Sequence, residues 1–401
     1  MSNSPLHSPA ETPSFRAALP AVLFVALIFF MNYTNRAILG PLLVYMEESL
    51  GLDHVQSTSF ILLLSTGFCI GVICSGVATS KVKPRLIIAL SAICGGGMLL
   101  VLSRAESVWG VRIPLALVGF SSGFYMTAAL ATLDSLARKE DWSRVIGVHE
   151  LSPAISFIIS PILAETTARL WGWQGAMVFT GCLSMTAGTL FLLFGKGGEQ
   201  KTERPSASGI IEAFKHGPVW IFIWLFAMGI AGEFAPFSVL TLSLTAEQGL
   251  ESEAASHLLS LSRLPSPFAA LAGGFATTRL GTKRTILLFL LTQGISLLVM
   301  ALPLSLIGMP IQFTAMACQA ASTAFVFPAL FTFFARSFPY NQQPILPSLS
   351  LPMASYVATG IFPFLLGACG EYLTFSFGYA AFGAVTLLSI LILVFMNRAE
   401  E

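Results

Sequence analysis

Long apolar runs fill almost the whole chain and restrict the folds that it can adopt. A helix needs about 20 consecutive apolar residues to cross the hydrocarbon core of a bilayer, and the 401-residue sequence contains twelve such runs. The runs are too long for the strands of a membrane β-barrel and lack their two-residue alternation. We therefore predict an all-α membrane protein with twelve spans, at residues 17–46, 57–79, 86–103, 112–134, 145–168, 175–195, 218–245, 253–278, 285–304, 309–335, 345–370 and 374–397.

The composition supports this fold class and excludes several functions. Charged residues make up only 10% of the chain, against about 25% in soluble domains. A net charge of +1 offers no basic surface to nucleic acid. All six cysteines lie in apolar runs without a C-x-x-C spacing, so we expect neither disulfides nor a metal site. No paired carboxylates, nucleophile–base set or phosphate loop suggests an enzyme, and no cofactor is expected.

The basic residues predict the orientation and the domain boundaries. Of the 21 Lys and Arg, 16 lie in the termini or the even-numbered connections, three in the odd-numbered connections and two inside spans. Positive loops remain cytoplasmic, so we expect both termini in the cytoplasm. The compact chain, with no signal peptide, suggests a monomer in a prokaryotic inner membrane. The predicted parts are a tail 1–16, a six-helix half 17–195, a cytoplasmic linker 196–217, a six-helix half 218–397 and a tail 398–401.

One short motif occurs in both halves. Residues 76–82 read GVATSKV and residues 274–280 read GFATTRL, and a basic cluster follows each of them. Each copy comes after the second span of its half and precedes the third. Repeated halves are typical of transporters, in which the substrate binds near the middle of the membrane between them.

The second copy resembles the signature loop of the major facilitator superfamily, roughly G-x-x-x-D-R-x-G-R-R/K. Gly274, Arg279, Gly281, Lys283 and Arg284 match that loop. The span count and the position of the linker extend the resemblance over the whole chain. The resemblance implies a secondary transporter that works by alternating access, with these loops as gating elements.

The first copy departs further from the signature. It keeps Gly76, Lys81 and Arg85 but lacks the inner glycine. Ser80 and Thr278 occupy the two positions of the family's aspartate, which helps to latch the cytoplasmic side. The resemblance therefore implies the fold of the family but not this latch.

Arg36 is an isolated charge deep in the first apolar run. A centred charge costs about 2.5–3.5 kcal/mol on insertion scales and so needs a partner or a function. Its guanidinium offers five donors that suit a carboxylate or phosphate, and Asn32 shares its helix face at i−4. We expect both residues to contact an anionic substrate. Snorkelling to the interface, or pairing with Glu47 or Glu48, is the alternative.

Arg263 and Glu233 are the corresponding charges of the second half. Arg263 lies in the middle of the eighth run, and Pro265 and Pro267 follow it and can loosen the helix. Several organic-anion branches of the resembled family also carry an arginine in this span. Glu233, in the seventh run, is a candidate proton site. The alternative for both residues is a static ion pair with each other.

Three further kinds of feature complete the candidate list. His149 and Glu150 open the fifth run as a possible proton relay or as a solvated gate pair. Tyr33 and Tyr125 are expected to line the substrate cavity. The spacings Gly67-x-x-x-Gly71 and Gly119-x-x-x-Gly123 let helices approach closely.

We therefore hypothesise that Arg36 and Arg263, one from each half, recognise a small organic anion across a central cavity. Proton coupling would pass through Glu233 or through His149 and Glu150. An exporter of drugs or amphiphiles, in which the arginines serve only in ion pairs, is the main alternative. A non-transporting sensor on the same fold is the second, although the predicted tails are short.

Overall fold

The computed structural model describes residues 14–136, 138–201, 217–337 and 347–393, which form helices and connecting loops without any strand. The tail residues 1–13 and 398–401, most of the predicted linker (202–216) and the edges of the last two predicted runs lie outside this range. The elements are α1 Phe15–Ala37, α2 Leu39–Leu50, α3 His54–Ala78, α4 Pro84–Leu102, α5 Val108–Leu136, η1 Lys139–Asp141, α6 Trp142–Phe194, α8 Gly217–Ala246, α9 Ser252–Ser262, α10 Ser266–Leu280, α11 Thr282–Met300, α12 Leu304–Ser337, α13 Pro347–Tyr356, the π-helical turn η2 Val357–Ile361, α14 Phe362–Tyr372, α15 Phe375–Leu388 and η3 Ser389–Ile392.

The prediction of an all-helical membrane fold is confirmed, and the helices are consistent with twelve spans. Within the described ranges, ten helical stretches are long and apolar enough to cross a bilayer. One of them, α6, turns back at Gly172 (φ 71°), so it contains the two predicted runs 145–168 and 175–195. The short helices α9 and α10 together cover the predicted run 253–278. Counting α6 as two spans, and α9 with α10 as one further span, brings the total within the described ranges to twelve.

The chain breaks where its sequence supplies a suitable residue. Positive φ angles, which glycine adopts without strain, occur at Gly172 and at Gly281, between α10 and α11. The break between α9 and α10 spans residues 263–265 and ends at Pro265, and Pro267 follows in the first turn of α10. Proline lacks the amide proton that a continuous helix needs. The sequence predicts a loosened helix at these prolines, and the structure has an interruption of the helix there.

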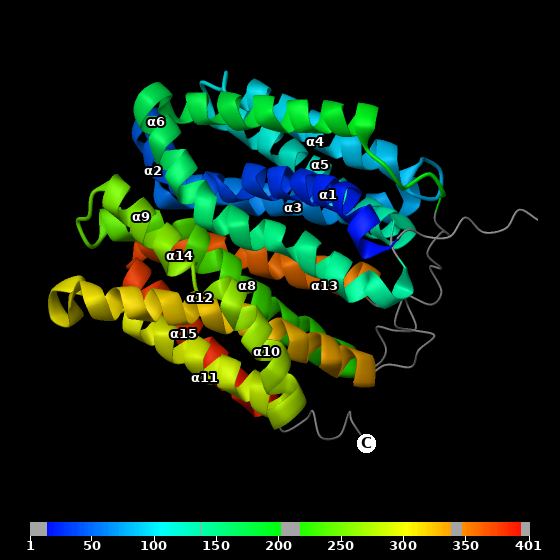
Figure 1. The fold of residues 1–401 in the computed structure, drawn as a ribbon. Helices are drawn as coiled ribbons and strands as arrows, with labels where there is room; N and C mark the ends of the chain where they lie inside the picture. The colour runs from blue at the N-terminus through cyan, green and yellow to red at the C-terminus, as the bar shows by residue number, and fades with distance from the viewer. Residues whose placement is uncertain (1–13, 137, 202–216, 338–346, 394–401) are drawn as a thin grey trace, which may run out of the picture.

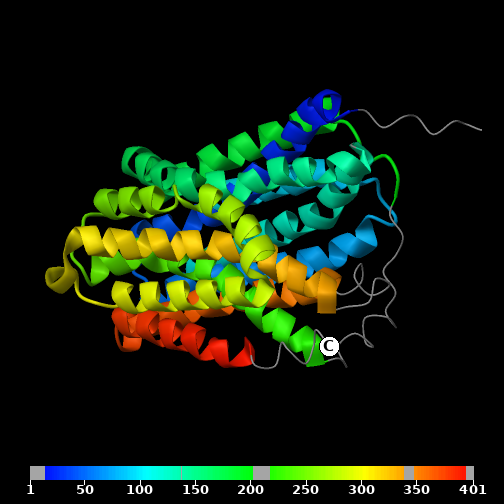
Figure 2. The same cartoon turned by 60° about the horizontal axis from the view of Figure 1, so that its bottom comes forward.

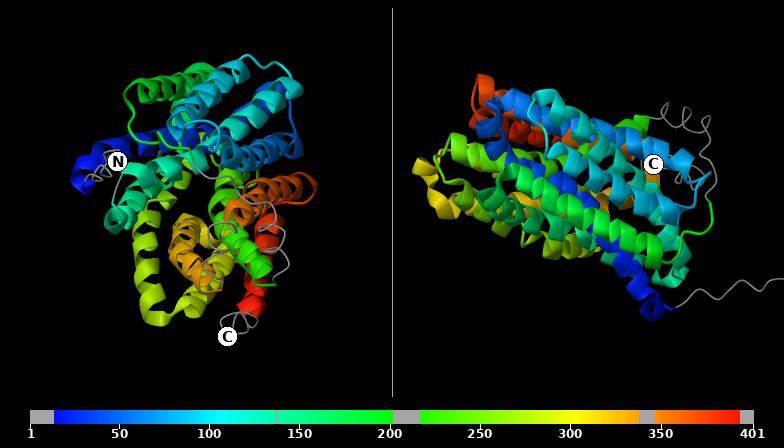
Figure 3. Two further views of the ribbon diagram at one scale, coloured as in Figure 1. Left: turned by 90° about the vertical axis from the view of Figure 1, so that its right-hand side faces the viewer. Right: turned by 90° about the horizontal axis from the view of Figure 1, so that it is seen from above.

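The helices run roughly side by side, and their loops gather at two ends (Figure 2). In Figure 1 the basic loops 79–83, 138–141 and 195–201 lie at the right, and we call this the basic end. The turn of α6 and the loops 51–53, 247–251 and 373–374 lie at the left, and we call this the opposite end. Seen along the bundle in Figure 3 (left), helices α1–α6 and helices α8–α15 occupy different sides.

Helices α3 and α5 pack at backbone distance through the glycines that the sequence singled out. A Cβ atom on Gly119 would lie 1.9 Å from the carbonyl oxygen of Leu64, and one on Gly67 would lie 1.9 Å from that of Ala116. Gly71 and Gly123 are crowded in the same way, at 2.2 Å from carbonyl oxygens. Small residues allow such contacts in membranes, where dispersion drives helix association.

Gly119→Ala should therefore destabilise the protein. The added methyl group meets backbone that cannot rotate away, so α3 and α5 must separate, at a cost of about 1–3 kcal/mol. Thermal unfolding of the purified protein in detergent measures the effect. Gly97→Ala on α4 is the control, since a Cβ there meets no atom within 4 Å. Equal melting temperatures for the two variants would contradict the packing account.

Candidate functional site

Arg36 lies near the end of α1 in an aromatic environment. Its side chain is only 6% exposed, and the guanidinium carbon lies 3.8 Å from the ring centre of Phe68 on α3. The rings of Tyr33 and Phe234 are 5.5 and 5.6 Å away. Its Nε–H is buried and has no hydrogen-bond partner. The ring faces stabilise the positive charge but leave this donor unused.

Arg263 occupies the break between α9 and α10 and is 3% exposed. One guanidinium nitrogen, Nη1, donates to the backbone carbonyl of Glu233 on α8 at 3.2 Å. The rings of Phe237 and Phe157 lie 5.3 and 5.6 Å from the guanidinium carbon. As in Arg36, the Nε–H is buried and unpartnered.

A group of aromatic rings joins the two arginines. Phe157 on α6 packs against Tyr33 at 5.3 Å, Phe237 at 4.5 Å and Phe234 at 6.0 Å, measured between ring centres. We call Tyr33, Phe68, Phe157, Phe234 and Phe237 the ring cluster. Both guanidinium groups lie against it, and its members come from α1, α3, α6 and α8. The structure thus brings together two charges that are more than 200 residues apart in the sequence.

Neither arginine forms an ion pair within the described ranges. The Glu233 side chain is half-buried and interacts electrostatically with Arg263, yet the hydrogen bond from Arg263 goes to its backbone. The static pair considered from the sequence is therefore not the arrangement seen here. Two guanidinium groups and one carboxylate remain available to a ligand.

Asn32 is placed away from this group. Its amide nitrogen donates to Ser91 Oγ on α4 at 3.0 Å, and the neighbouring Asn35 donates to Ser184 Oγ on α6 at 3.0 Å. Both asparagines are buried between α1 and the helices behind it. The i−4 spacing predicts a helix face shared with Arg36, whereas Asn32 contacts Ser91 on α4 and Arg36 contacts Phe68 on α3. We assign Asn32 to helix packing.

Tyr125, His149 and Glu150 form a second polar group on α5 and α6. Tyr125 Oη donates to the carbonyl of Val25 and lies 2.9 Å from His149 Nε2, while Glu150 Oε1 lies 3.0 Å from His149 Nδ1. Tyr125 has one proton, so when it donates to Val25 its oxygen can only accept a hydrogen bond from His149 Nε2–H. His149 is fully buried and the Glu150 side chain is 54% exposed.

Phe29 connects this second group to the ring cluster. Its ring stacks on His149 at 4.2 Å and on Tyr125 at 5.2 Å, and it meets Tyr33 edge to face at 5.8 Å. Tyr125 is thus placed behind Phe29 and does not touch either arginine. Glu150 nevertheless interacts electrostatically with Tyr33 and Glu233.

A set of polar contacts at the opposite end was not predicted from the sequence. Glu165 on α6 accepts hydrogen bonds from Tyr45 on α2 and from Ser252 and Ser256 on α9. Beside it, Arg169 pairs with Glu253. Glu165 is an acidic residue inside the fifth predicted run, and that signal alone could have drawn attention to it.

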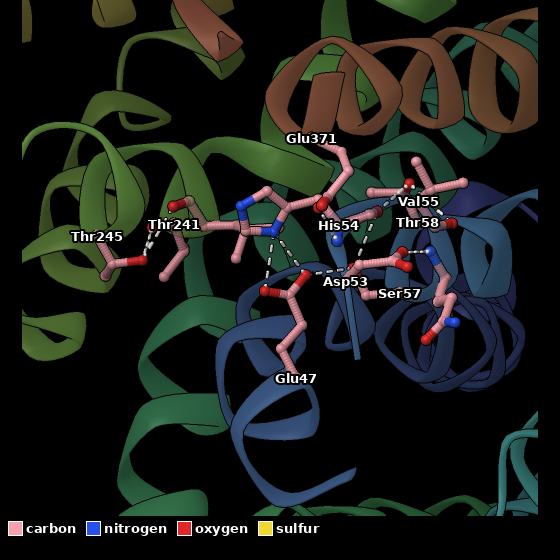
Figure 4. A network of polar contacts seen from close by, with 11 residues as sticks. Glu47, Asp53, His54, Val55, Ser57, Thr58, Thr241, Thr245 and Glu371 are labelled. Atoms are coloured by element: carbon pink, nitrogen blue, oxygen red, sulfur yellow. Dashed lines mark hydrogen bonds and ion pairs between the residues drawn. The ribbon is translucent and has the colours of Figure 1, made fainter. Parts of the chain in front are cut away.

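His54 forms another contact of this kind, shown in Figure 4. Its ring nitrogen Nδ1 lies 2.9 Å from Oε2 of Glu47, and Ser57 donates to Oε1 of the same carboxylate. Its backbone amide donates to Glu371 at 2.8 Å. Helices α1–α6 are thus joined to helices α8–α15 by hydrogen bonds that gather at the opposite end.

The gating-loop residues of the two halves have different surroundings. In the first copy, Lys83 and Arg85 hold Glu199, at 2.7 and 3.2 Å, and the Arg85 amide donates to the Gly198 carbonyl. The pKa of Glu199 falls below its ordinary value, first because Lys83 donates a hydrogen bond to it and then because of Arg85. Gly76 ends α3 and Lys81 is exposed. In the second copy Gly274 lies within α10, Arg279 lies in its last turn and Gly281 follows it, while Arg284 is exposed in α11.

Comparisons with known proteins agree on one family. A family model described as Major Facilitator Superfamily matches residues 25–345. No curated protein matches the chain by sequence. The structure is similar to that of a bacterial homologue of the human lysosomal transporter Spinster, in an inward-facing and occupied conformation, with a TM-score of 0.78, 13% identity and coverage of 96% of this chain and 97% of that chain.

Two further similar structures are of transporters that are named for different substrates. A mutant of the nucleoside transporter NupG gives a TM-score of 0.77 at 14% identity, covering 94% of this chain and 99% of that chain. A D-xylose–proton symporter gives 0.73 at 14% identity, covering 97% and 98%. At such identities the likeness defines the fold of this chain and leaves its substrate open.

The contacts of Glu199 predict how the start of the linker is held. Glu199→Gln removes the charge between Lys83 and Arg85, so trypsin should cleave after Lys201 about two- to fivefold faster, as expected for exposed ion pairs. Since the pKa of Glu199 is lowered, the wild-type protection should persist above the ordinary glutamate range near pH 4.3 and disappear as the pH falls below it.

Mass spectrometry of the first cleavage products measures this rate. The control is Glu140→Gln, which removes an exposed charge at the same end. If both variants are cleaved at the wild-type rate, the linker is held by something other than Glu199.

Proposed function

We propose a substrate class for a chain that belongs to the Major Facilitator Superfamily and is a multi-pass membrane transporter. Its substrate is a small organic anion of the carboxylate or phosphate type, and its transport is coupled to protons. The observation that carries this proposal is the pair of buried arginines without a carboxylate partner among the described residues.

The environment of the arginines supports an anionic ligand. A charge buried in a membrane protein needs compensation, and the rings around Arg36 and Arg263 compensate only the faces of the guanidinium groups. Each Nε–H remains unpartnered, although such donors normally find an acceptor. A carboxylate or phosphate can accept two parallel hydrogen bonds from one guanidinium group. Tyr33, which is half-buried beside both arginines, is the candidate for an additional polar contact.

Charge balance supports a role for Glu233 in proton coupling. With Glu233 ionised, the group of Arg36, Arg263 and Glu233 carries a charge of +1, and with Glu233 protonated it carries +2. An anion should therefore bind more tightly to the protonated form, and binding and protonation should favour each other. The group of Glu150, His149 and Tyr125 is the candidate route for this proton, because Glu150 is exposed and His149 is not.

The transport cycle that we propose rocks residues 17–195 against residues 218–397 around the ring cluster. The linker 196–217 joins the two halves, and the loops with Lys81 and Arg85 and with Arg279 and Arg284 form the cytoplasmic gate. The positive-inside rule supports cytoplasmic termini. We place the protein in a prokaryotic inner membrane as a monomer.

An exporter of amphiphiles is the second candidate, and the ring cluster favours it. Five aromatic side chains surround the arginines, and they offer an apolar surface on which a flat ligand could pack. In that case the arginines would position the rings and would not bind an anion.

Arg36→Ala and Arg263→Ala should each abolish most uptake of the anion. The loss of hydrogen bonds between charged groups, worth about 1.5–3 kcal/mol, weakens substrate binding by about tenfold to a hundredfold. Uptake of radiolabelled carboxylates and phosphates into proteoliposomes measures the change. Asn32→Ala is the control, because Asn32 bonds Ser91 and not the ring cluster. Anion uptake that survives in both arginine variants would overturn the proposal.

Glu233→Gln should separate anion binding from the proton. The neutral side chain mimics the protonated form, so the anion should bind at neutral pH at least as tightly as it binds to the wild type at low pH. Uphill transport driven by a pH gradient should stop, while exchange of internal for external anion continues. A pH-sensitive dye inside the vesicles follows the protons. Unchanged proton movement in this variant would assign the coupling to other groups.

A further inference from the structure

We infer that Gln319 on α12 is a positioning residue for the proposed anion site. Its side-chain amide replaces a backbone hydrogen bond that α8 lacks at Pro236, and in this way it fixes the direction in which α8 presents Glu233. The inference rests on the proposed function, because it assigns Gln319 a role that is exerted through Glu233 and Arg263.

Pro236 interrupts the hydrogen bonding of α8 in the interior of that helix. In an α-helix each backbone N–H bonds the carbonyl four residues earlier, so the proline leaves the Gly232 carbonyl without its usual donor. Gly232 is buried, and an unbonded carbonyl inside a membrane protein is costly. The sequence GEFAP at residues 232–236 therefore requires a donor from elsewhere in the protein.

Gln319 supplies this donor from α12. Its Nε2 donates to the Gly232 carbonyl, and the residue is only 1% exposed. The same nitrogen carries a second proton, which it donates to Gln293 Oε1 on α11 at 3.3 Å. That oxygen also accepts hydrogen bonds from Ser322 and Thr323, at 3.0 and 3.3 Å. The acceptor of one proton is thus held in place, and this directs the other proton at α8.

The glycine at position 232 lets the two glutamines reach the backbone of α8. A Cβ atom there would lie 2.1 Å from Gln293 Nε2 and 3.0 Å from its Oε1, so a larger residue would displace the pair. The glycine, the proline and the amide donor therefore form one unit, which is built from α8, α11 and α12.

The next carbonyl along α8 connects this unit to the arginine site. Arg263 Nη1 donates to the Glu233 carbonyl at 3.2 Å. Peptide groups are planar, so holding the carbonyls of residues 232 and 233 fixes the backbone on both sides of the Glu233 Cα atom. The direction of its Cβ atom follows from that backbone. The Glu233 side chain is thereby kept near Arg263, with which it interacts electrostatically.

Carbodiimide labelling of Glu233 tests the inference without any substrate. Dicyclohexylcarbodiimide reacts with the neutral form of a carboxyl group in apolar surroundings, and the Arg263 guanidinium beside Glu233 disfavours that form. Gln319→Leu removes the amide and keeps a side chain of similar size, so α8 can turn at Pro236 and move Glu233 away from Arg263. The rate of labelling at Glu233, located by mass spectrometry, should rise about twofold to tenfold, as expected for the loss of one hydrogen bond.

Gln312→Leu is the matched control. Gln312 is another buried glutamine of α12, and its Oε1 has no hydrogen-bond partner among the described residues. The labelling rate of Glu233 should therefore stay at the wild-type value in this variant. Thermal unfolding shows that the compared variants are equally folded at the temperature of the reaction.

Pro236→Ala separates positioning from packing. Alanine restores the backbone N–H that bonds the Gly232 carbonyl, so the Gln319 amide is no longer needed. In the Pro236→Ala background, Gln319→Leu should leave the labelling rate of Glu233 unchanged, and a double-mutant cycle measures this coupling. If Gln319→Leu alone does not fold, the double variant should fold, because the backbone supplies the missing donor.

Three results would overturn the inference. One is an unchanged or lower labelling rate of Glu233 in Gln319→Leu. The second is a rise of equal size in the Pro236→Ala background, which would make Gln319 a packing residue. The third is a double variant that fails to fold together with Gln319→Leu. Labelling requires no substrate, so a chain that carried no anion would contradict the proposed function and would leave these three outcomes unaffected.

Discussion

An uncompensated charge inside a bilayer is the constraint on which the rest of this structure depends. Arg36 and Arg263 satisfy it in an unusual way, because aromatic rings cover their faces while no carboxylate of the described chain pairs with them. A purely structural charge would be expected to find an acidic partner. The ring cluster stabilises the two guanidinium groups and at the same time leaves the Nε–H donor of each available, which is the condition that a reusable anion site requires.

The backbone obeys a related constraint, since every peptide group in lipid must be hydrogen-bonded within the protein. The chain meets it with helices, and it tolerates irregular backbone only inside the bundle. One such break holds Arg263, and Arg36 lies two residues before the turn at Ile38 that separates α1 from α2. Both arginines are thus attached to the points at which their helices are interrupted. A break of this kind can change its angle during a transport cycle with little disturbance to the helices on either side.

The sequence predicted those parts of the account that depend on local pattern. Apolar run length and loop charge suffice for the fold class, and the four glycines of α3 and α5 suffice for their close packing. Arg36, Arg263 and Glu233 stood out because a charge in an apolar run is rare.

The ring cluster could not be predicted, because its phenylalanines come from three helices and resemble the other phenylalanines of this phenylalanine-rich chain. The contact of Asn32 with Ser91 could not be predicted, because helix periodicity defines a face without identifying the residues that this face meets. Glu165 was missed although it is an acid in an apolar run, since only its contacts across the two helix groups distinguish it.

Thermal unfolding of the purified protein against a panel of small anions and apolar cations tests the central claim most directly. A ligand present at 100 times its dissociation constant adds about 2.7 kcal/mol of stability. We predict stabilisation by a carboxylate or phosphate compound, and its loss when Arg36 and Arg263 are both replaced by alanine. Stabilisation by apolar cations that persists in that double variant would contradict the account and would make the ring cluster, without the arginines, the binding surface.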